Sequence, residues 1–133
     1  MPRSSMRPDS AFLKDVLTAC QKIESIVAAN SEESFLKDEV LTAAVLHHLT
    51  VIGEAFGRLS VELQGRHPEV PWRQIVAVRN RIVHAYFDLD WQILWDAAIE
   101  DVPELRRQIL NILKTESSLA RENACDIDFE DYH

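Results

Sequence analysis

The chain has 133 residues, of which 47% are hydrophobic and 27% charged, and its formal net charge is −8. This length suits one domain with one core, and the sequence has neither the ~20 consecutive apolar residues of a membrane span nor the uninterrupted apolar stretch of a secretory signal, so we expect a cytoplasmic protein. The negative charge also opposes general affinity for nucleic acid, because phosphate binding depends on Lys and Arg.

A helical pattern begins close to the N-terminus. From Phe12 to Val27, apolar residues recur at three- and four-residue steps, after the breaker Pro8 and two possible capping residues. This spacing predicts an amphipathic helix over about residues 10–29. The polar cluster at 31–34 then predicts a break.

The next apolar stripe runs from Val40 to Leu63 and predicts one long helix, the longest of the chain. Gly65 suits a helix C-terminus, and the prolines at 68 and 71 cannot prolong a helix. We therefore expect a loop over about residues 64–70.

The second half of the chain predicts further helices. Pro71 suits the first turn of a helix, and the apolar spacing after it predicts a third helix over 71–87. Residues 88–90 interrupt the pattern, and a fourth helix begins after them. Asp101 and Pro103 mark either a kink or a fresh start, of which we favour a fresh start.

The whole chain shows no strand-like alternation, only three glycines and no internal repeat. These features predict an all-α fold, an antiparallel bundle of four to five helices, over residues 1–115. Residues 116–133 form an acidic, weakly periodic C-terminal tail that we expect to be mobile. Cys20 and Cys125 have neither metal-ligand spacing nor a disulfide framework, so we expect both to be free thiols.

Positive charge is concentrated in the middle of the sequence. Residues 58–84 carry five arginines against two glutamates, a local balance of +3, whereas residues 85–133 carry twelve acids against four bases. A basic segment inside an acidic chain suits a confined anion site better than a broad DNA-binding surface. Arg73 and Arg81 are candidate substrate contacts, and the alternative is that these arginines are solvated surface residues.

The candidate site lies in the sequence RNRIVHAYF, residues 79–87. On an ideal helix Arg79 and Tyr86, seven residues apart, share one stripe. Asn80 and His84 share the neighbouring stripe, so one polar groove can hold all four side chains. The alternative is structural, since an arginine and a histidine also satisfy a helix C-terminus and a tyrosine ring also anchors a bundle.

These residue types suit the cleavage of RNA without a metal. His84 can take the proton of the attacking 2′-hydroxyl or donate one to the leaving oxygen. The guanidinium of Arg79 can stabilise charge on the phosphoryl oxygens, and Asn80 can orient the phosphate or the imidazole. One His84 cannot easily act on opposite sides of the same phosphate, which predicts an obligate homodimer with two facing copies of the site.

The motif resembles that of the HepT-like proteins of the HEPN superfamily, because Arg79 and Asn80 are followed by His84, Ala85 and Tyr86 at the family's spacing. Three longer segments also look like this family in content and order: VIGEAFGRLS at 51–60, PEVPWRQIVAVRNRIVHAYFDLDW at 68–91 and DVPELRRQI at 101–109. The resemblance implies a HEPN bundle, a dimer with a composite site, and metal-independent endoribonuclease activity on cellular RNA such as tRNA or mRNA, with no cofactor.

The resemblance also implies a toxin with a partner. Its antitoxin is a minimal nucleotidyltransferase of the MntA type, which transfers AMP to the tyrosine of the motif, here Tyr86. A phosphate at Tyr86 would lie beside the guanidinium of Arg79 that substrate needs. Glu54, in the family-like IGEA segment, is expected either to pair with an arginine near the site or to be an ordinary surface carboxylate.

The remaining histidines do not predict a metal site, and we expect none. His47 and His48 point about 100° apart on their helix, and His67 lies in the predicted loop without a partner. Two other functions compete with the ribonuclease. One is a non-catalytic HEPN module that binds nucleotide or positions a nucleotidyltransferase, and the other is a purely structural helical oligomer.

Overall fold

A computed structural model describes residues 7–73, 75 and 90–131 of the chain, with the backbone alone for 120–131. Its elements are α1 (Asp9–Ala28), α2 (Glu32–Lys37), α3 (Glu39–Gly57), α4 (Val61–Arg66), α6 (Trp91–Asp96), the π-helical turn η3 (Ala97–Asp101) and α7 (Val102–Asp131). The described residues contain no strand. The all-α fold expected from the sequence is confirmed.

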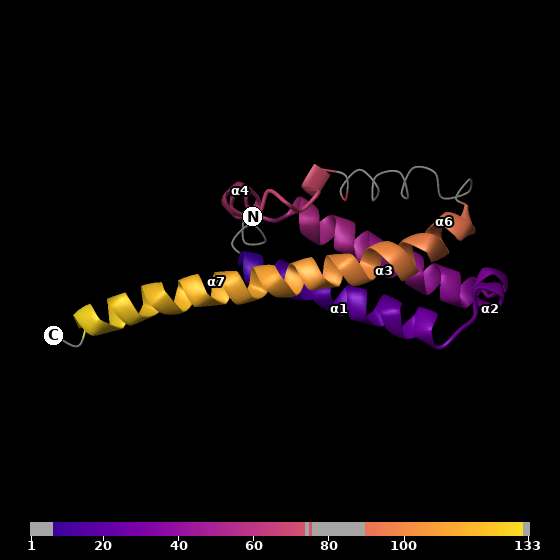
Figure 1. Ribbon diagram of the computed structural model, residues 1–133, viewed down its shortest axis with the longest axis horizontal. Helices are drawn as coiled ribbons and strands as arrows, with labels where there is room; N and C mark the ends of the chain where they lie inside the picture. The colour runs from indigo at the N-terminus through magenta and orange to yellow at the C-terminus, as the bar shows by residue number, and fades with distance from the viewer. Residues whose placement is uncertain (1–6, 74, 76–89, 132–133) are drawn as a thin grey trace.

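Three helices form the body of the bundle. α1 runs antiparallel to both α3 and α7 and packs against these two more extensively than any other pair of described elements pack together (Figure 1). α2 and α6 pack against each other at one end of the bundle, and α4 lies at the other end (Figure 1).

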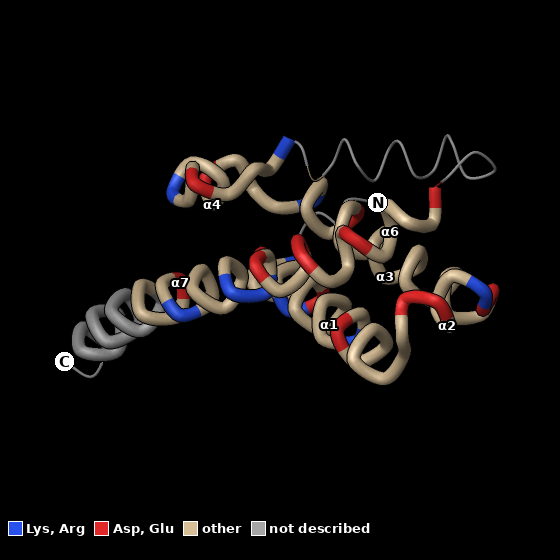
Figure 2. The backbone as a smooth tube through the Cα atoms, turned by 45° about the vertical axis from the view of Figure 1, so that its right-hand side comes forward, with Lys and Arg blue, Asp and Glu red and all other residues tan. Residues whose placement is uncertain are grey.

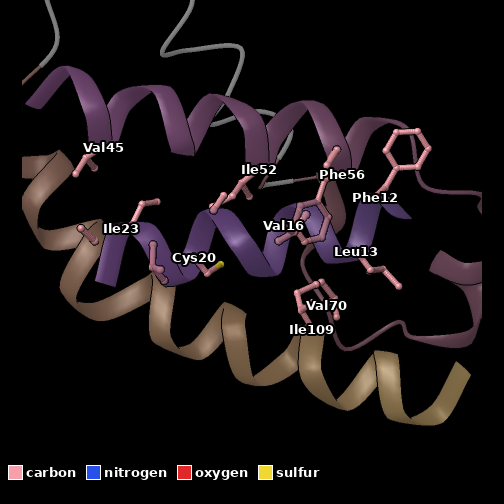
Figure 3. Packing of buried hydrophobic residues seen from close by; sticks show 14 of the residues in the cluster. Phe12, Leu13, Val16, Cys20, Ile23, Val45, Ile52, Phe56, Val70 and Ile109 are labelled. Carbon is pink, nitrogen blue, oxygen red and sulfur yellow. The ribbon is translucent and has the colours of Figure 1, made fainter. Parts of the chain in front are cut away.

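Apolar side chains from these helices meet in one core (Figure 3). Its fully buried members include Leu13, Val16 and Ile23 from α1, Val45 and Phe56 from α3, and Ile109 and Ile112 from α7. Val70, in the loop after α4, is also buried in this cluster. The loop that precedes the candidate motif is therefore tied directly to the core.

The helix predicted over 40–63 is two helices, α3 and α4, so the prediction of one long helix was wrong. Ser60 lies between them with an extended backbone, and its hydroxyl accepts a hydrogen bond from the N–H of Leu63 at 3.1 Å as the N-cap of α4. The apolar stripe continues through Leu59 and Leu63, both buried, and so does not show the break. The longest helix is instead α7, with 30 residues.

The polar cluster at 31–34 was expected to be a break but begins a short helix, α2. Ser31 is its N-cap, and its hydroxyl accepts a hydrogen bond from the N–H of Ser34 at 3.1 Å. α2 buries one side chain completely, that of Phe35, whose ring centroid lies 5.1 Å from that of Trp95 on α6. This aromatic pair fastens α2 to the bundle.

α6, η3 and α7 follow one another without a loop, so the fresh start favoured at Pro103 was wrong. In η3 the N–H of Val102 donates to the carbonyl of Ala97, five residues earlier. A regular α-helix would bring the carbonyl of Ile99 against the proline ring, which also has no N–H to donate. The wider π turn lets the helix pass the proline without breaking.

α7 also continues past residue 115, where the sequence predicts that the helical bundle ends and a C-terminal tail begins. Its backbone is helical to Asp131, and its C-terminal part extends beyond the other helices (Figure 1). Residues 116–131 therefore prolong the last helix of the bundle.

α3 is the one helix in the described ranges with the length and apolar composition of a membrane span. Three of its side chains, Val45, Ile52 and Phe56, are buried in the core on the side of α3 that faces α1. This packing accounts for the apolar composition of α3, because a helix that contributes to the core of a bundle can have the length and hydropathy of a membrane span.

Candidate active site

The predicted site residues divide into two groups. Arg79, Asn80, Arg81, His84 and Tyr86 lie outside the described residues. Glu54 and Arg73 lie within them, as does the chain that leads into the motif. The structure therefore shows how the motif segment, residues 71–87, is held at its N-terminal end, and which residues surround Glu54.

The motif segment begins with a helical turn at Pro71. The N–H of Ile75 donates to the carbonyl of Pro71 at 3.1 Å, as predicted for a proline in the first turn of a helix. Both residues line an apolar cavity of about 330 Å³ between α3 and α7. Arg73 projects from the same turn, is exposed, and makes no hydrogen bond or ion pair with the described residues. Its guanidinium is thus available to an anion.

His67 holds the chain just before this turn. Its side chain is only 7% exposed, and its Nε2 lies 2.9 Å from a carboxylate oxygen of Glu116 on α7. Because an ionised carboxylate only accepts hydrogen bonds, we assign the ring proton to Nε2. The expectation that His67 has no partner was wrong, since its partner is 49 residues away in sequence.

Glu116 serves Arg66 as well as His67. The guanidinium of Arg66 donates to both carboxylate oxygens, from Nε at 3.1 Å and from Nη2 at 2.7 Å. The hydrogen bond from Arg66 lowers the pKa of Glu116, and the hydrogen bond from His67 adds to this effect against the opposing influence of partial burial. Arg66, one of the five arginines in the basic segment, is therefore already paired within the protein.

Trp72 connects the first turn of the motif segment back to this cluster. Its indole N–H donates to the carbonyl of His67 at 2.9 Å. Its ring packs against Phe56 of α3, with ring centroids 5.2 Å apart. Trp72 is half-buried. A tryptophan at this position could anchor the core or stack on an RNA base, and these two contacts favour the anchor.

Glu54 is half-buried on α3, at a hollow of about 220 Å³ between α1 and α3. Arg7 and Arg58 also line this hollow. Arg7 is engaged by Asp15 at 2.8 Å, whereas Arg58 is exposed and makes no ion pair with the described residues. Glu54 thus shares the lining of this hollow with two arginines.

His47 and His48 lie on α3 with their ring centroids 5.2 Å apart and their rings steeply inclined. Burial lowers the pKa of His48, and the neighbouring charges of His47 and Lys22 lower it further. No group of three potential metal ligands occurs among the residues that the structure describes. The described histidines therefore offer hydrogen bonds and packing.

Charged side chains are distributed over the whole described surface. Lys and Arg occur on α1, α2, α4 and α7 and at the start of the motif segment, and acidic residues are interspersed with them (Figure 2). In the described ranges this arrangement does not form a broad basic face.

Comparison with known proteins assigns the family. The family described as Ribonuclease HepT-like matches residues 16–112, a range that contains the whole candidate motif. The chain belongs to the HepT-like ribonuclease family. The HEPN resemblance seen in the motif is confirmed, and the protein is a ribonuclease by family.

Several relatives of this HepT-like ribonuclease share most of its length. It is 35% identical to "Putative RNase TTE0752" of Caldanaerobacter subterraneus over 84% of this chain and 99% of the relative. It is 33% identical to "Probable ribonuclease HepT" of Thermococcus cleftensis over 81% of this chain and 98% of the relative. A third relative, "Putative RNase MJ0127" of Methanocaldococcus jannaschii, is 34% identical over 86% and 92%. No solved structure matches the chain significantly.

The structure contains one polar cluster next to the candidate site that the sequence did not reveal. The cluster of Arg66, His67 and Glu116 joins α4 to α7 next to the motif segment. No local pattern signals it, because its carboxylate comes from a position 49 residues beyond the histidine. The weak signal was that an arginine and a histidine stand side by side in the predicted loop, directly before Pro68.

Proposed function

We propose that this HepT-like ribonuclease is the toxin of a toxin–antitoxin pair and cleaves cytoplasmic RNA, tRNA or mRNA, without a metal. The observation that carries the proposal is the family match over residues 16–112, which contains Arg79, Asn80 and His84 at the spacing of the family motif. The exposed guanidinium of Arg73, at the start of the same segment, supports a role in holding the phosphate backbone.

The proposed reaction needs two proton carriers on opposite sides of one phosphate. The imidazole of His84 in one copy takes the proton of the 2′-hydroxyl while the 2′-oxygen bonds to phosphorus. The bond from phosphorus to the 5′-oxygen breaks, and His84 of the second copy donates a proton to that oxygen. The products are a cyclic 2′,3′-phosphate and a free 5′-hydroxyl, and Arg79 stabilises the charged phosphoryl oxygens between the two steps.

This requirement makes a homodimer part of the proposal. A single imidazole held by one chain cannot reach both the attacking and the leaving oxygen, whereas two copies related by a two-fold axis present one imidazole to each. Asn80 orients the phosphate or the ring of His84. Glu54 and Arg81 complete the substrate contacts as a positioning carboxylate and a further guanidinium.

Regulation by a minimal nucleotidyltransferase of the MntA type completes the proposal. The hydroxyl oxygen of Tyr86 attacks the α-phosphorus of ATP, forms the Tyr–AMP bond and releases pyrophosphate. The added phosphate then pairs with the guanidinium of Arg79, seven residues earlier on the same predicted helical stripe, and keeps RNA from binding there.

Purified protein incubated with tRNA and mRNA in the presence of EDTA tests the nuclease. We expect cleavage to cyclic phosphate ends by the wild-type protein and its loss in His84→Ala and Arg79→Ala. Arg107→Ala is the matched control, because Arg107 is an exposed arginine on α7 whose one ion pair within the described residues is with its neighbour Glu104. Absence of cleavage by the unmodified wild-type protein would contradict the enzyme and favour the binding module.

Intact mass after incubation with the nucleotidyltransferase and ATP tests the regulation. We expect addition of AMP to the wild-type protein and none to Tyr86→Phe. The chain has one other tyrosine, so Tyr132→Phe is the matched control and should be modified like the wild type. Modification of Tyr86→Phe to the wild-type extent would contradict the assignment of Tyr86.

A further inference from the structure

We propose that Glu116 is a positioning residue for the catalytic segment of this ribonuclease and acts through His67 and Trp72. The inference rests on the proposed function, since it assumes that Arg79 and His84 carry the reaction. It adds a residue from the last helix of the bundle, far from the motif in sequence.

The first step is the contact between α7 and the loop before the motif. Glu116 binds the ring of His67 at 2.9 Å and the guanidinium of Arg66 at 2.7 Å. The side chain of Glu116 is 20% exposed and that of His67 is 7% exposed, so the bond between these two is largely shielded from water, whereas the side chain of Arg66 is 45% exposed. The carboxylate of Glu116 therefore ties both His67 and Arg66 to α7.

The second step is the contact between His67 and the motif segment. The carbonyl of His67 accepts a hydrogen bond from the indole of Trp72 at 2.9 Å, and the same carbonyl accepts one from the N–H of Val70 at 3.3 Å. The ring of Trp72 also packs against the ring of Phe56 on α3, with the two ring centroids 5.2 Å apart. The first turn of the segment is thus held from both α7 and α3.

The third step follows from the covalent chain. Trp72 precedes Arg79 by seven residues and His84 by twelve in the sequence. A shift of the segment's starting point therefore moves both candidate catalytic groups relative to a bound phosphate. Catalysis is sensitive to such shifts, because a displacement of about 1 Å can cost on the order of 100-fold in rate.

The bundle offers a matched control for the loss of a carboxylate. Glu24 of α1 accepts a hydrogen bond from Arg106 of α7 at 2.8 Å, and its side chain is 26% exposed, close to the value for Glu116. Both carboxylates join α7 to another part of the protein. Only Glu116 contacts the loop that leads to the motif.

The experiment measures kcat and KM for RNA cleavage, with EDTA present, at a temperature where thermal melting shows each variant to be folded. We expect Glu116→Ala to lower kcat by about 10-fold or more while KM changes little, and Glu24→Ala to lose stability without losing kcat. Glu116→Gln, whose amide oxygen still accepts hydrogen bonds, should recover most of the lost kcat. Trp72→Phe, which removes the indole N–H and keeps a smaller aromatic ring, should also lower kcat.

The outcomes separate this inference from the function beneath it. If His84→Ala is inactive but Glu116→Ala keeps the wild-type kcat, or if Glu24→Ala loses as much kcat as Glu116→Ala, the positioning role is rejected and the nuclease stands. If His84→Ala cleaves at the wild-type rate, the proposed function is rejected and the inference with it.

Discussion

Asp9, in the first turn of α1, accepts two hydrogen bonds from Ser60, the residue that starts α4. One comes from the backbone N–H of Ser60 at 2.9 Å and the other from its hydroxyl at 2.5 Å. The hydroxyl of Ser60 in turn accepts from the N–H of Leu63, so Asp9 completes the cap of a helix that begins 51 residues later. This contact explains why the chain turns between α3 and α4 where the apolar pattern alone predicts a continuous helix.

Asp9→Ala should destabilise the fold by about 1–2 kcal/mol, because hydrogen bonds to a charged group contribute more than neutral ones but this group is partly exposed. The measurement is the free energy of unfolding in urea. Asp9→Asn retains an acceptor oxygen and should lose less. Equal losses in the two variants would show that charge rather than capping geometry dominates.

The low pKa of Glu116 predicts a pH-dependent contribution to stability. A carboxyl whose pKa is lowered by folding stabilises the protein above its usual value of 4.5, and this contribution disappears as pH falls through the lower folded value. The stability difference between the wild type and Glu116→Gln should therefore be largest near neutral pH and shrink between pH 4.5 and strong acid. Urea unfolding at a series of pH values checks this, and a constant difference would contradict it.

Cys20 should be unreactive in the folded protein. Its side chain is buried on α1, and burial raises the pKa of the thiol from 9.0 to about 12. In a Cys125→Ser background, alkylation by iodoacetamide at pH 8 should follow the rate of unfolding rather than that of a free thiol. Because a raised pKa favours the folded state below the unfolded value, stability should also fall as pH rises from 9.0 towards 12.

Phe35 makes α2 a part of the core. The side chain is fully buried and packs on Trp95, so Phe35→Ala should cost about 3–5 kcal/mol. Phe35→Leu keeps most of the volume and should cost about 1 kcal/mol. Thermal or urea unfolding distinguishes the two, and a loss below 1 kcal/mol in the alanine variant would mean that α2 is held by other contacts.

Helix existence could be predicted from the sequence more securely than helix boundaries. The apolar spacing from Phe12 to Val27 predicted α1 to within one or two residues at each end, because one stripe of that helix forms the core. The same signal failed at Ser60, where the apolar stripe continues across a break. At Pro103 the proline signal failed instead, because a π turn lets the helix continue. The cap that Asp9 supplies and the π turn before Pro103 depend on the local and tertiary contacts of the folded chain. The periodicity of apolar residues carries no information about such contacts.

The candidate site was found from the motif because its residues are close in sequence. Arg79 and His84 are five positions apart, so a helical reading could place them together. The contact between His67 and Glu116 spans 49 residues and has no local pattern. Contacts of this kind depend on how the helices pack, and the structure was needed to show them.

The proposed dimer makes a quantitative prediction for mixed assemblies. If each cleavage needs the imidazole of His84 from both copies, a dimer of one wild-type and one His84→Ala chain should be inactive. Refolding an equal mixture of the two chains together should then give about a quarter of the activity of the same total amount of wild-type protein, since only that share of random dimers is fully wild-type. Two independent sites would give about half. An equal mixture with Arg107→Ala controls for refolding and should keep full activity, because that arginine is exposed and, in the part of the chain that the structure describes, pairs with Glu104 alone.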